Sequence, residues 1–499
     1  MQVSSIGTRL LAIAAAAFLL RLTVRLHSGE ADFWQNGYSF LFELAHNFAA
    51  GRGLAFDGGP PTTSRVPVYP LFLAAVTFGR HAFVPIVVAQ SLIGAATVFC
   101  VGLTAEWFGP GGPGGAGWSG GSRESRESRG SSAERLRPRF DAAMQSRGEA
   151  PASVRAGGAR LRQGYGGSAA ARQNITASGS WRAPAPVKKS QSGGLAAVFA
   201  AFYPYYIVHD TALQDTGLFT AVTLISVLLV IRARRTRSGA VAACAGSALA
   251  VAVLTRSTIA PFALLAPVWL YFSRSFEPRA KAPGAGTPPA RLALICAAVL
   301  IIGVTPWLVR SYALTGSVVL ESDSGARLWD GNSPYTFTRY PVESIDLSKK
   351  EAIEALSPGE LADLGAAGSN EVAIDRWFMH RALAYMREHP WLTIVNGFRK
   401  IGAAFSVLPS PRRSLWPTLA YSLSYGPIMI LGLCGMISCW RSWRQHVLIY
   451  WLFFSFAVVT AVVFGHTSHR AFLDVYWMAY AASLIATCLP KTTMVESGL

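Results

Sequence analysis

The stretch that decides the fold is GEADFWQNGYSFLFELAHNFAAGRGLAFDGGPPTTSRVPVYP, residues Gly29–Pro70. It is polar and rich in glycine, and it lies between a first hydrophobic segment at 9–26 and a longer one at 83–107. Within it, apolar residues recur at helical spacing: Leu41, Leu44, Ala45, Phe48 and Ala49. This spacing predicts an amphipathic helix in a membrane interface, ended by the glycines that follow. The stretch is therefore expected to be an external loop of a membrane protein.

The rest of the chain has the composition of a membrane protein. Of its 499 residues, 51% are hydrophobic and fall in repeated blocks, which indicates several membrane-spanning helices. The net charge of +18 would suggest nucleic acid in a soluble chain. Here the basic residues concentrate between hydrophobic segments, as the positive-inside rule describes, so we expect membrane lipids and no nucleic acid as partners. The six cysteines lie in or beside apolar segments without CxxC spacing, and we expect packed thiols.

The hydrophobic blocks predict an all-α polytopic membrane protein with about ten membrane helices. They are expected near residues 9–26, 83–107, 194–209, 216–232, 239–255, 258–273, 292–309, 417–438, 446–464 and 471–489. The segment 66–78 is apolar but only 13 residues long, which predicts a juxtamembrane helix rather than a crossing. If the segment 66–78 does not cross the membrane, the basic loops and both termini lie on the cytoplasmic side. The first block resembles a signal-peptide core, but Arg21 and Arg25 follow it without a cleavage site, so we expect an uncleaved helix.

Five regions follow from this interpretation. They are residues 1–109 with the first membrane helices and an external loop at 27–82, an insertion at 110–193, a membrane core at 194–309, an external region at 310–416 and the last membrane helices at 417–499. The insertion is rich in Gly, Ser and Arg, with 14 Lys or Arg against 5 acidic residues. This composition predicts a disordered cytoplasmic linker beside anionic lipid, and binding of nucleic acid is the less favoured alternative.

The external region 310–416 is predicted to combine helices with a short β-hairpin. The hairpin is expected in SYALTGSVVLESDSGARLWDGNSPY, ending at Gly331–Asn332, because of its alternation and turn residues. Two or three soluble helices are expected at 348–389, followed by an amphipathic segment that contains Lys400. Asn332 and Lys400, together with Tyr69 of the first loop, are candidate residues of loops that cover a substrate.

The first loop carries carboxylates and a cation suited to chemistry at a membrane surface. Asp32 is the candidate catalytic residue, a carboxylate that can act as general base, and Glu30 and Glu43 are the alternatives. Arg65 is a candidate phosphate ligand, since a guanidinium matches phosphate geometry with two hydrogen bonds.

Further candidates lie in three later external turns. Asp210 and Asp215 fall in a hairpin between two membrane helices, where a pair of helix caps is the structural alternative. Arg256 follows in a tight turn and Arg470 in the last one, GHTSHRAFLD, and both are candidate phosphate ligands. The last turn also contains HxxH, but without a nearby paired carboxylate this is a weak zinc signal. We expect no metal site, and no residue pattern supports a divalent cation as cofactor.

These motifs resemble a known family. A carboxylate after the first membrane helix, AxNFAxGxG at 45–53 and SRVPVYPLFLA at 64–74 are similar to the first external loop of bacterial GT-C type membrane glycosyltransferases. These are the protein mannosyltransferase-like enzymes, which include the aminoarabinose transferases of lipid A. The resemblance implies a polyprenyl-phosphate sugar as donor, a loop carboxylate as catalytic residue and inversion by direct displacement. It also implies a second carboxylate, which Asp215 matches better than Asp210. Asp32 precedes Ala45 by 13 residues, a longer spacing than in many relatives.

The expected function is transfer of a sugar from a polyprenyl-phosphate donor to a lipid, glycan or protein acceptor of the envelope. We expect the reaction on the external, periplasmic face of a bacterial inner membrane. Two alternatives remain open. A transporter or flippase of a lipid-linked substrate would need ionisable residues or broken helices at mid-membrane. A non-catalytic membrane scaffold would not need the external carboxylates and arginines.

Overall fold

The structure, a computed structural model, describes residues 2–108, 191–272, 286–368 and 370–488. Within these ranges the regular secondary structure is all helical, and β-pairing is limited to one isolated bridge between Ala55 and Pro61. The chain is thus an all-α membrane protein, as predicted. The predicted insertion lies almost wholly outside the described residues, and its disorder stays a prediction.

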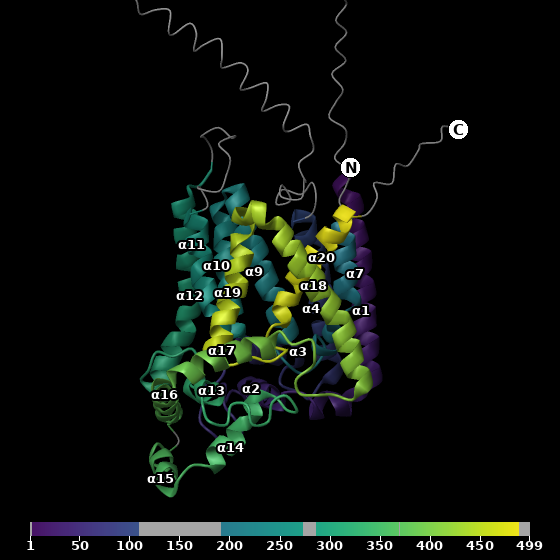
Figure 1. Cartoon of the computed structure of the whole chain (residues 1–499). Coiled ribbons are helices and arrows are strands. Elements are labelled where there is room, and N and C mark those ends of the chain that lie inside the picture. Colours follow the sequence, from purple (N-terminus) through teal and green to yellow (C-terminus); the bar gives the residue numbers. More distant parts are fainter. Residues whose placement is uncertain (1, 109–190, 273–285, 369, 489–499) are drawn as a thin grey trace, which may run out of the picture. The chain divides into compact units, whose positions relative to one another are not determined.

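Apolar helices run side by side in a bundle (Figure 1). They are α1 (Gln2–Gln35), α4 (Phe83–Phe108), α7 (Ser192–Phe202), α9 (Thr216–Thr236), α10 (Gly239–Thr255), α11 (Ala260–Phe272), α12 (Pro289–Thr315), α18 (Leu415–Ser438), α19 (Trp443–Val462) and α20 (Ala471–Cys488). Six helical segments in the described ranges are long and apolar enough to cross a membrane; one of them, Leu415–Val462, joins α18 and α19 through the short helix η4 (Cys439–Ser442). α7, α10 and α11 are shorter than a typical span of about 20 residues, so the ten crossings stay a prediction.

Burial differs between helices because the bundle has a centre and a rim. The residues of α20 from Ala471 to Ser483 are all buried, whereas α1 and α12 expose large apolar side chains such as Leu19, Ile301 and Ile302. Apolar surface of this kind is unfavourable in water and is matched by lipid tails. The structure is therefore that of a multi-pass membrane protein.

Glycine lets two pairs of helices approach closely. A Cβ on Gly246 of α10 would lie 2.4 Å from the carbonyl oxygen of Cys296 of α12, and one on Gly435 of α18 would lie 2.5 Å from that of Tyr480 of α20. Small residues at helix contacts are typical of membrane proteins, because surrounding lipid removes the hydrophobic force that would otherwise drive helices together.

The predicted third membrane helix is in fact two helices, α7 and α8 (Pro204–His209). Pro204 has no N–H and cannot continue α7. The carbonyl oxygens of Ala200 and Ala201, freed at the break, accept hydrogen bonds of 3.1 and 3.3 Å from the Arg21 guanidinium of α1. Arg21 therefore satisfies backbone groups that lipid could not satisfy.

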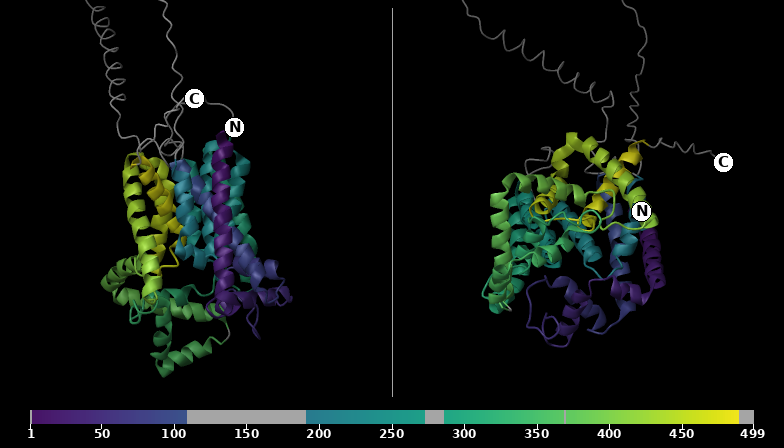
Figure 2. Two further views of the ribbon diagram at one scale, coloured as in Figure 1. Left: turned by 90° about the vertical axis from the view of Figure 1, so that its right-hand side faces the viewer. Right: turned by 60° about the horizontal axis from the view of Figure 1, so that its bottom comes forward.

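Shorter helices cover the end of the bundle opposite the start of α1 and the end of α20 (Figures 1 and 2). They are α2 (Ser39–Ala49), α3 (Val68–Thr77), α13 (Ser324–Gly331), η3 (Ile345–Ser348), α14 (Lys349–Glu354), α15 (Pro358–Ala366), α16 (Glu371–Glu388) and α17 (Pro390–Ala404). We call this end the loop end. α1 turns at Gly29, whose φ of 85° suits glycine, so that its last residues belong to the loop end. The ten residues of α3 span about 15 Å, too short to cross a bilayer.

The predicted β-hairpin of the external region is wrong, because that part of the chain contains α13. Asp375 of α16 accepts a 2.6 Å hydrogen bond from the backbone N–H of Gly325, one of the first donors of the helix. At the other end of α13, a Cβ on Gly331 would lie 1.6 Å from the carbonyl oxygen of Val463. Both contacts are tertiary, so the local alternation of residues did not reveal them.

The basic turns lie at the end of the bundle opposite the loop end. α9 runs for 21 residues, roughly 30 Å, from the loop end to Arg234 and Arg235 in its last turn. α19 starts next to η4, which contains Arg441, and ends at the loop end with Val462. The length of the bundle thus separates the acidic loops from these arginines.

Candidate active site

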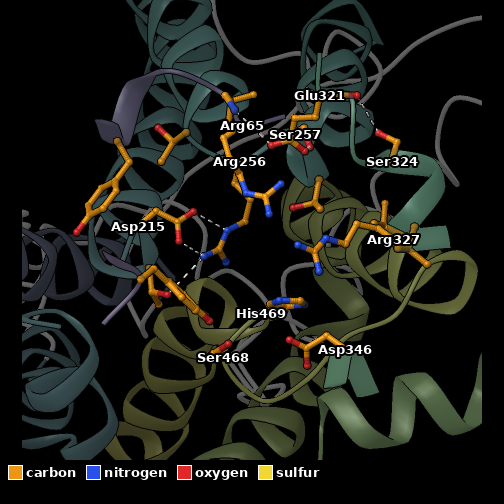
Figure 3. Close-up of a pocket in the computed structure, with 18 of the residues that line it drawn as sticks. Arg65, Asp215, Arg256, Ser257, Glu321, Ser324, Arg327, Asp346, Ser468 and His469 are labelled. Atoms are coloured by element: carbon orange, nitrogen blue, oxygen red, sulfur yellow. Dashed lines mark hydrogen bonds and ion pairs between the residues drawn. The ribbon is translucent and has the colours of Figure 1, made fainter. Parts of the chain in front are cut away.

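A cavity of about 560 Å³ lies at the loop end of the bundle. Its walls come from the first loop, the start of α9, the turn between α10 and α11, the segment around α13 and η3, and the turn after α19 (Figure 3). The titratable side chains that line it include Arg65, Asp215, Arg256, Glu321, Arg327, Asp346, His466 and His469. These residues are far apart in the sequence, so the cavity exists only in the folded chain.

Arg256 and Asp215 form a two-pronged ion pair on one wall. Nε and Nη2 of Arg256 donate to the two carboxylate oxygens of Asp215 at 2.9 and 2.5 Å. The remaining nitrogen of Arg256, Nη1, is buried and has no hydrogen-bond partner among the described residues. A buried N–H without a partner is unfavourable, and an anionic oxygen of a ligand would satisfy it.

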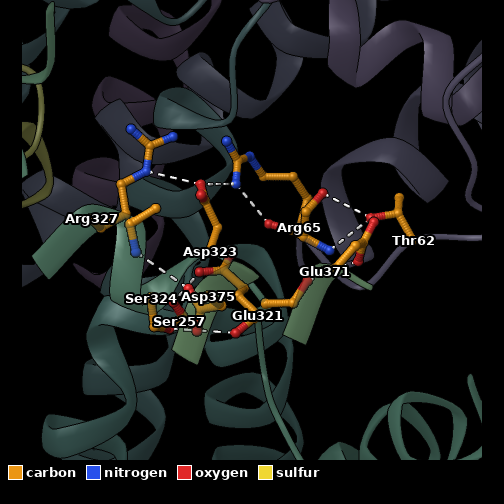
Figure 4. Close-up of polar contacts among 12 residues, drawn as sticks. Thr62, Arg65, Ser257, Glu321, Asp323, Ser324, Arg327, Glu371 and Asp375 are labelled. Carbon is orange, nitrogen blue, oxygen red and sulfur yellow. Dashed lines mark hydrogen bonds and ion pairs between the residues drawn. The ribbon is translucent and has the colours of Figure 1, made fainter. Parts of the chain in front are cut away.

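Arg65 and Arg327 share the carboxylate of Asp323 (Figure 4). Nη1 of Arg65 and Nε of Arg327 donate to the same oxygen, Oδ2, at 2.7 and 3.0 Å. Asp330, which is buried behind them, lies 3.6 Å from Nη1 of Arg327, and burial raises its pKa to about 7. Asp330 is therefore partly protonated at neutral pH, and Asp323 is the carboxylate that both arginines share.

Glu321 lies beside these arginines. Its Oε2 accepts a 2.7 Å hydrogen bond from the Ser257 hydroxyl, and its Oε1 accepts a weaker one of 3.4 Å from the Val66 N–H. Burial raises the pKa of Glu321, and the Ser257 hydrogen bond and the charge of Arg65 oppose that rise.

Asp346 lies with the two histidines on another part of the wall. In Figure 3, Asp346 and His469 stand on the opposite side of the cavity from Arg65 and Glu321. The rings of His466 and His469 are 4.0 Å apart between centroids. Burial lowers the pKa of both histidines, so both imidazoles are neutral at neutral pH.

The remaining lining is aromatic and aliphatic. It includes Tyr38, Phe40 and Tyr69 of the first loop and Phe456 and Val459 of α19. Tyr69 is buried, and its hydroxyl accepts a 3.0 Å hydrogen bond from Nε2 of Gln90. Tyr69 therefore lines the cavity, where a substrate-loop residue is expected.

Asp32 lies outside the cavity lining. Its Oδ2 accepts a 2.9 Å hydrogen bond from Nη1 of Arg25, and its side chain is 44% exposed. Arg25 in turn donates to the Thr211 hydroxyl at 3.2 Å and to the Val208 carbonyl at 2.9 Å. Asp32 thus orients Arg25, which holds the chain segment leading to Asp215. The role of Asp32 as general base stays a prediction.

Glu30 and Glu43 also lie outside the cavity lining. Glu30 accepts a 3.1 Å hydrogen bond from the Trp34 indole, and Glu43 accepts one of 2.5 Å from the backbone N–H of Asp57. Asn47 of the AxN motif donates to the Ala55 carbonyl at 2.7 Å. Asn47 and Glu43 thus bind the backbone of the glycine-rich loop, which gives the polar residues of this segment a structural role.

Asp210 and Arg470 form buried ion pairs inside the bundle and do not line the cavity. Asp210 accepts from Nε of Arg21 at 2.9 Å, and Arg470 donates to Asp474 at 2.6 Å. Arg470 also donates to the Ala404 carbonyl at 2.8 Å. Both pairs are closed to solvent, so Arg470 is not placed to meet a phosphate in the cavity.

Lys400 and Asn332 join helices beside the cavity. The buried Nζ of Lys400 donates to the carbonyl oxygens of Gly331, Val462 and Val463 and to Oδ1 of Asn332, at 3.0 to 3.2 Å. These contacts connect α17 to the ends of α13 and α19. α19 ends at Val462, and the next residue, Val463, lines the cavity.

Glu321, Arg327 and Asp346 line the cavity but were not among the predicted site residues. Glu321 and Arg327 fall in the segment that was assigned to a hairpin, and Asp346 follows in polar chain without a motif. The density of charge in ESDSGARLWD, directly after a membrane helix, was the available signal. A search of known protein-family models finds no match to the chain, and a search of curated proteins finds no significant match.

Proposed function

We propose that this protein is a membrane glycosyltransferase that moves a sugar from a polyprenyl-phosphate donor to an envelope acceptor. The observation that carries the proposal is the group of three arginines, Arg65, Arg256 and Arg327, that line one cavity at the end of an apolar bundle. A phosphate on a lipid chain must stay at the membrane surface while its chain stays in the bilayer. Guanidinium groups in a cavity at the end of a bundle can bind such an anion.

The chemistry requires that the cavity stabilise a leaving phosphate. As the bond between the anomeric carbon and the phosphate oxygen breaks, negative charge grows on that oxygen, and fixed guanidinium groups stabilise the growing charge. The acceptor hydroxyl loses its proton to a carboxylate. The aromatic and aliphatic lining offers surface to the sugar ring and to the first units of the lipid chain.

We place the cavity on the external face of a bacterial inner membrane, with both termini in the cytoplasm. The basic turns with Arg235 and Arg441 lie at the opposite end of the bundle, and basic turns are enriched on the cytoplasmic side. Labelling of single cysteines at positions 57 and 441 from either side of the membrane tests this orientation.

The proposal is tested with purified protein in proteoliposomes. A panel of radiolabelled undecaprenyl-phosphate monosaccharides is offered together with an envelope extract from a strain that lacks the protein. We expect label from at least one donor to enter a lipid, glycan or protein of the extract. If no donor is consumed by folded protein, the proposal is wrong.

A flippase of lipid-linked sugars is the second candidate, since the broken helix α7–α8 and the buried Arg21–Asp210 pair are features that transporters use. Arg21 is, however, already bonded to Asp210 and to the carbonyls of α7, as a structural pair would be. The same proteoliposomes distinguish the two functions, because a flippase moves the donor between leaflets without consuming it.

A further inference from the structure

Building on the proposed glycosyl transfer, we propose that Asp346 is the general base that accepts the proton of the acceptor hydroxyl. The argument rests on the state of each carboxylate in and around the cavity. A general base needs an oxygen lone pair that no other group already occupies, within reach of the reacting atoms.

The other carboxylates at the cavity are engaged. Both oxygens of Asp215 accept hydrogen bonds from Arg256. Asp323 accepts from two arginines at Oδ2, and it is not part of the cavity lining. Glu321 accepts from a serine hydroxyl and a backbone N–H. A proton placed on any of these groups would compete with the hydrogen bonds that hold the wall together.

Asp346 differs from them. It lines the cavity, and its side chain makes no hydrogen bond or ion pair within the described part of the chain. Its Oδ1 is buried without a partner. A buried carboxylate oxygen without a donor is unfavourable in the free protein, and a substrate hydroxyl would satisfy it.

Side chains of α13, of the turn after α19 and of the first loop interact electrostatically with Asp346. The positive charge of Arg327 in α13 acts on it, while Asp330 of the same helix is partly protonated and repels it less than a full charge would. His466 and Tyr38 face it from the turn after α19 and from the first loop, and both are neutral at neutral pH. Among these groups, Arg327 supplies a positive charge, and His466 and Tyr38 are neutral.

The placement suits displacement with inversion, in which the base and the leaving group lie on opposite faces of the sugar. Asp346 stands across the cavity from Arg65 in Figure 3. In the step, the acceptor oxygen forms a bond to the anomeric carbon while the bond from that carbon to the phosphate oxygen breaks. The bonding pair leaves with polyprenyl phosphate, and the hydroxyl proton passes to Asp346.

The first test is Asp346→Asn, measured with the donor that the wild type consumes. Turnover should fall roughly 100- to 10,000-fold, as is typical when a general base is removed, while binding of the donor lipid stays near the wild-type level. Asp363→Asn is the matched control, because Asp363 is an exposed aspartate of α15 in the same external region. Turnover within about tenfold of the wild type in Asp346→Asn would overturn the proposal.

The second test is Asp346→Ala with sodium azide, an anion that attacks the anomeric carbon without needing a base. Azide should restore donor consumption and yield a glycosyl azide of inverted configuration, detected by mass spectrometry and NMR. Asp32→Ala, whose carboxylate lies outside the cavity lining, should not be restored by azide. Restoration of Asp32→Ala instead of Asp346→Ala would return the base to Asp32.

The two proposals fail in different ways. If the wild type consumes no polyprenyl-phosphate sugar, the glycosyltransferase proposal falls, and the base assignment falls with it. If the wild type is active but neither Asp346 variant binds the donor, Asp346 is a binding or structural residue and only the base assignment is wrong.

Discussion

Arg65 and Arg470 were predicted to bind the same phosphate, yet the structure surrounds them differently. Arg470 is fully buried and bonded to Asp474 and to a carbonyl. Arg65 is about a quarter exposed, lines the cavity and shares its acceptor with Arg327. A guanidinium has five N–H groups in a fixed fork, so the number already engaged decides whether it can bind a ligand.

Arg327→Ala tests this distinction at a residue that no motif marks. The change should weaken binding of a polyprenyl-phosphate donor by about 1.5 to 3 kcal/mol, because it removes hydrogen bonds to a charged group. Arg327→Lys should recover part of the loss, since an ammonium keeps the charge but not the fork. Binding is measured in nanodiscs with a fluorescent donor lipid.

The control for that measurement is Arg339→Ala. Arg339 belongs to the same external region, pairs with Glu343 and Glu351, and does not line the cavity. Its loss should leave donor binding within about twofold of the wild type. Equal weakening in both variants would show that external arginines attract the donor only through general charge.

Among the helices, the junction of α13, α17 and α19 depends on one side chain. Lys400 places an ammonium among four oxygens with no carboxylate near enough to pair with it in the described residues. Such a group connects three helix ends at once, and two of these helices carry cavity residues. The alignment of the cavity walls therefore depends on the protonation and burial of this lysine.

The pH dependence of stability tests that junction. Burial lowers the pKa of Lys400 from 10.5 to about 7. Between these two pKa values the unfolded chain binds a proton that the folded chain has lost. The free energy of unfolding therefore rises with pH from about 7 to 10.5. Below about pH 7 both states bind the proton, and this stabilising contribution of Lys400 is lost. The melting temperature of the wild type in detergent should therefore rise between pH 7 and 9 relative to Lys400→Met.

Lys400→Met should also be less stable than the wild type, because four buried oxygens lose their shared donor. The matched control is Lys350→Met, since Lys350 is exposed on α14 of the same region. If the melting temperatures of the wild type and of Lys400→Met change identically with pH, the lowered pKa of Lys400 is contradicted.

For the molecule as a whole, the helices that flank the insertion meet at its base. The Ser192 hydroxyl donates to the Ala105 carbonyl at 3.0 Å, and the Gly193 N–H donates to Glu106 at 2.9 Å. The last turn of α4 and the first turn of α7 are thus joined by direct hydrogen bonds. The bundle should fold whether the connection between these helices is long or short.

Replacement of residues 110–190 by a short Gly/Ser linker tests this expectation. Membrane insertion and transfer activity should be kept, and the shorter loop should raise stability by up to about 2 kcal/mol, because closing it loses less entropy. Thermal melting and the donor assay measure the outcome. Adding Glu106→Ala to the shortened chain should lower its stability, since one of the two contacts is lost. A shortened chain that fails to fold would show that the insertion packs against the bundle.

The sequence by itself determined the class of protein and the place of its loops. Apolar blocks, basic turns and the helical spacing at 41–49 depend on residues near each other in the chain, so hydropathy and local periodicity were enough to predict an all-α membrane protein with short helices outside the bundle. Asp215 and Arg256 were also found from the sequence, because each stands in a turn next to a membrane helix. Arg65 was found because it stands in the polar first loop.

Only the tertiary structure decided which of the candidate residues share a cavity. Asp32 and Asp210 are carboxylates of predicted external loops just as Asp215 is, but their oxygens accept from Arg25 and Arg21, which no local pattern indicates. Arg327 enters the cavity because α13 forms where alternation predicted a hairpin, and Asp346 enters it from η3. The physical reason is that hydropathy and periodicity are local properties, whereas the partner of a charge and the burial of an oxygen depend on segments that are distant in the sequence.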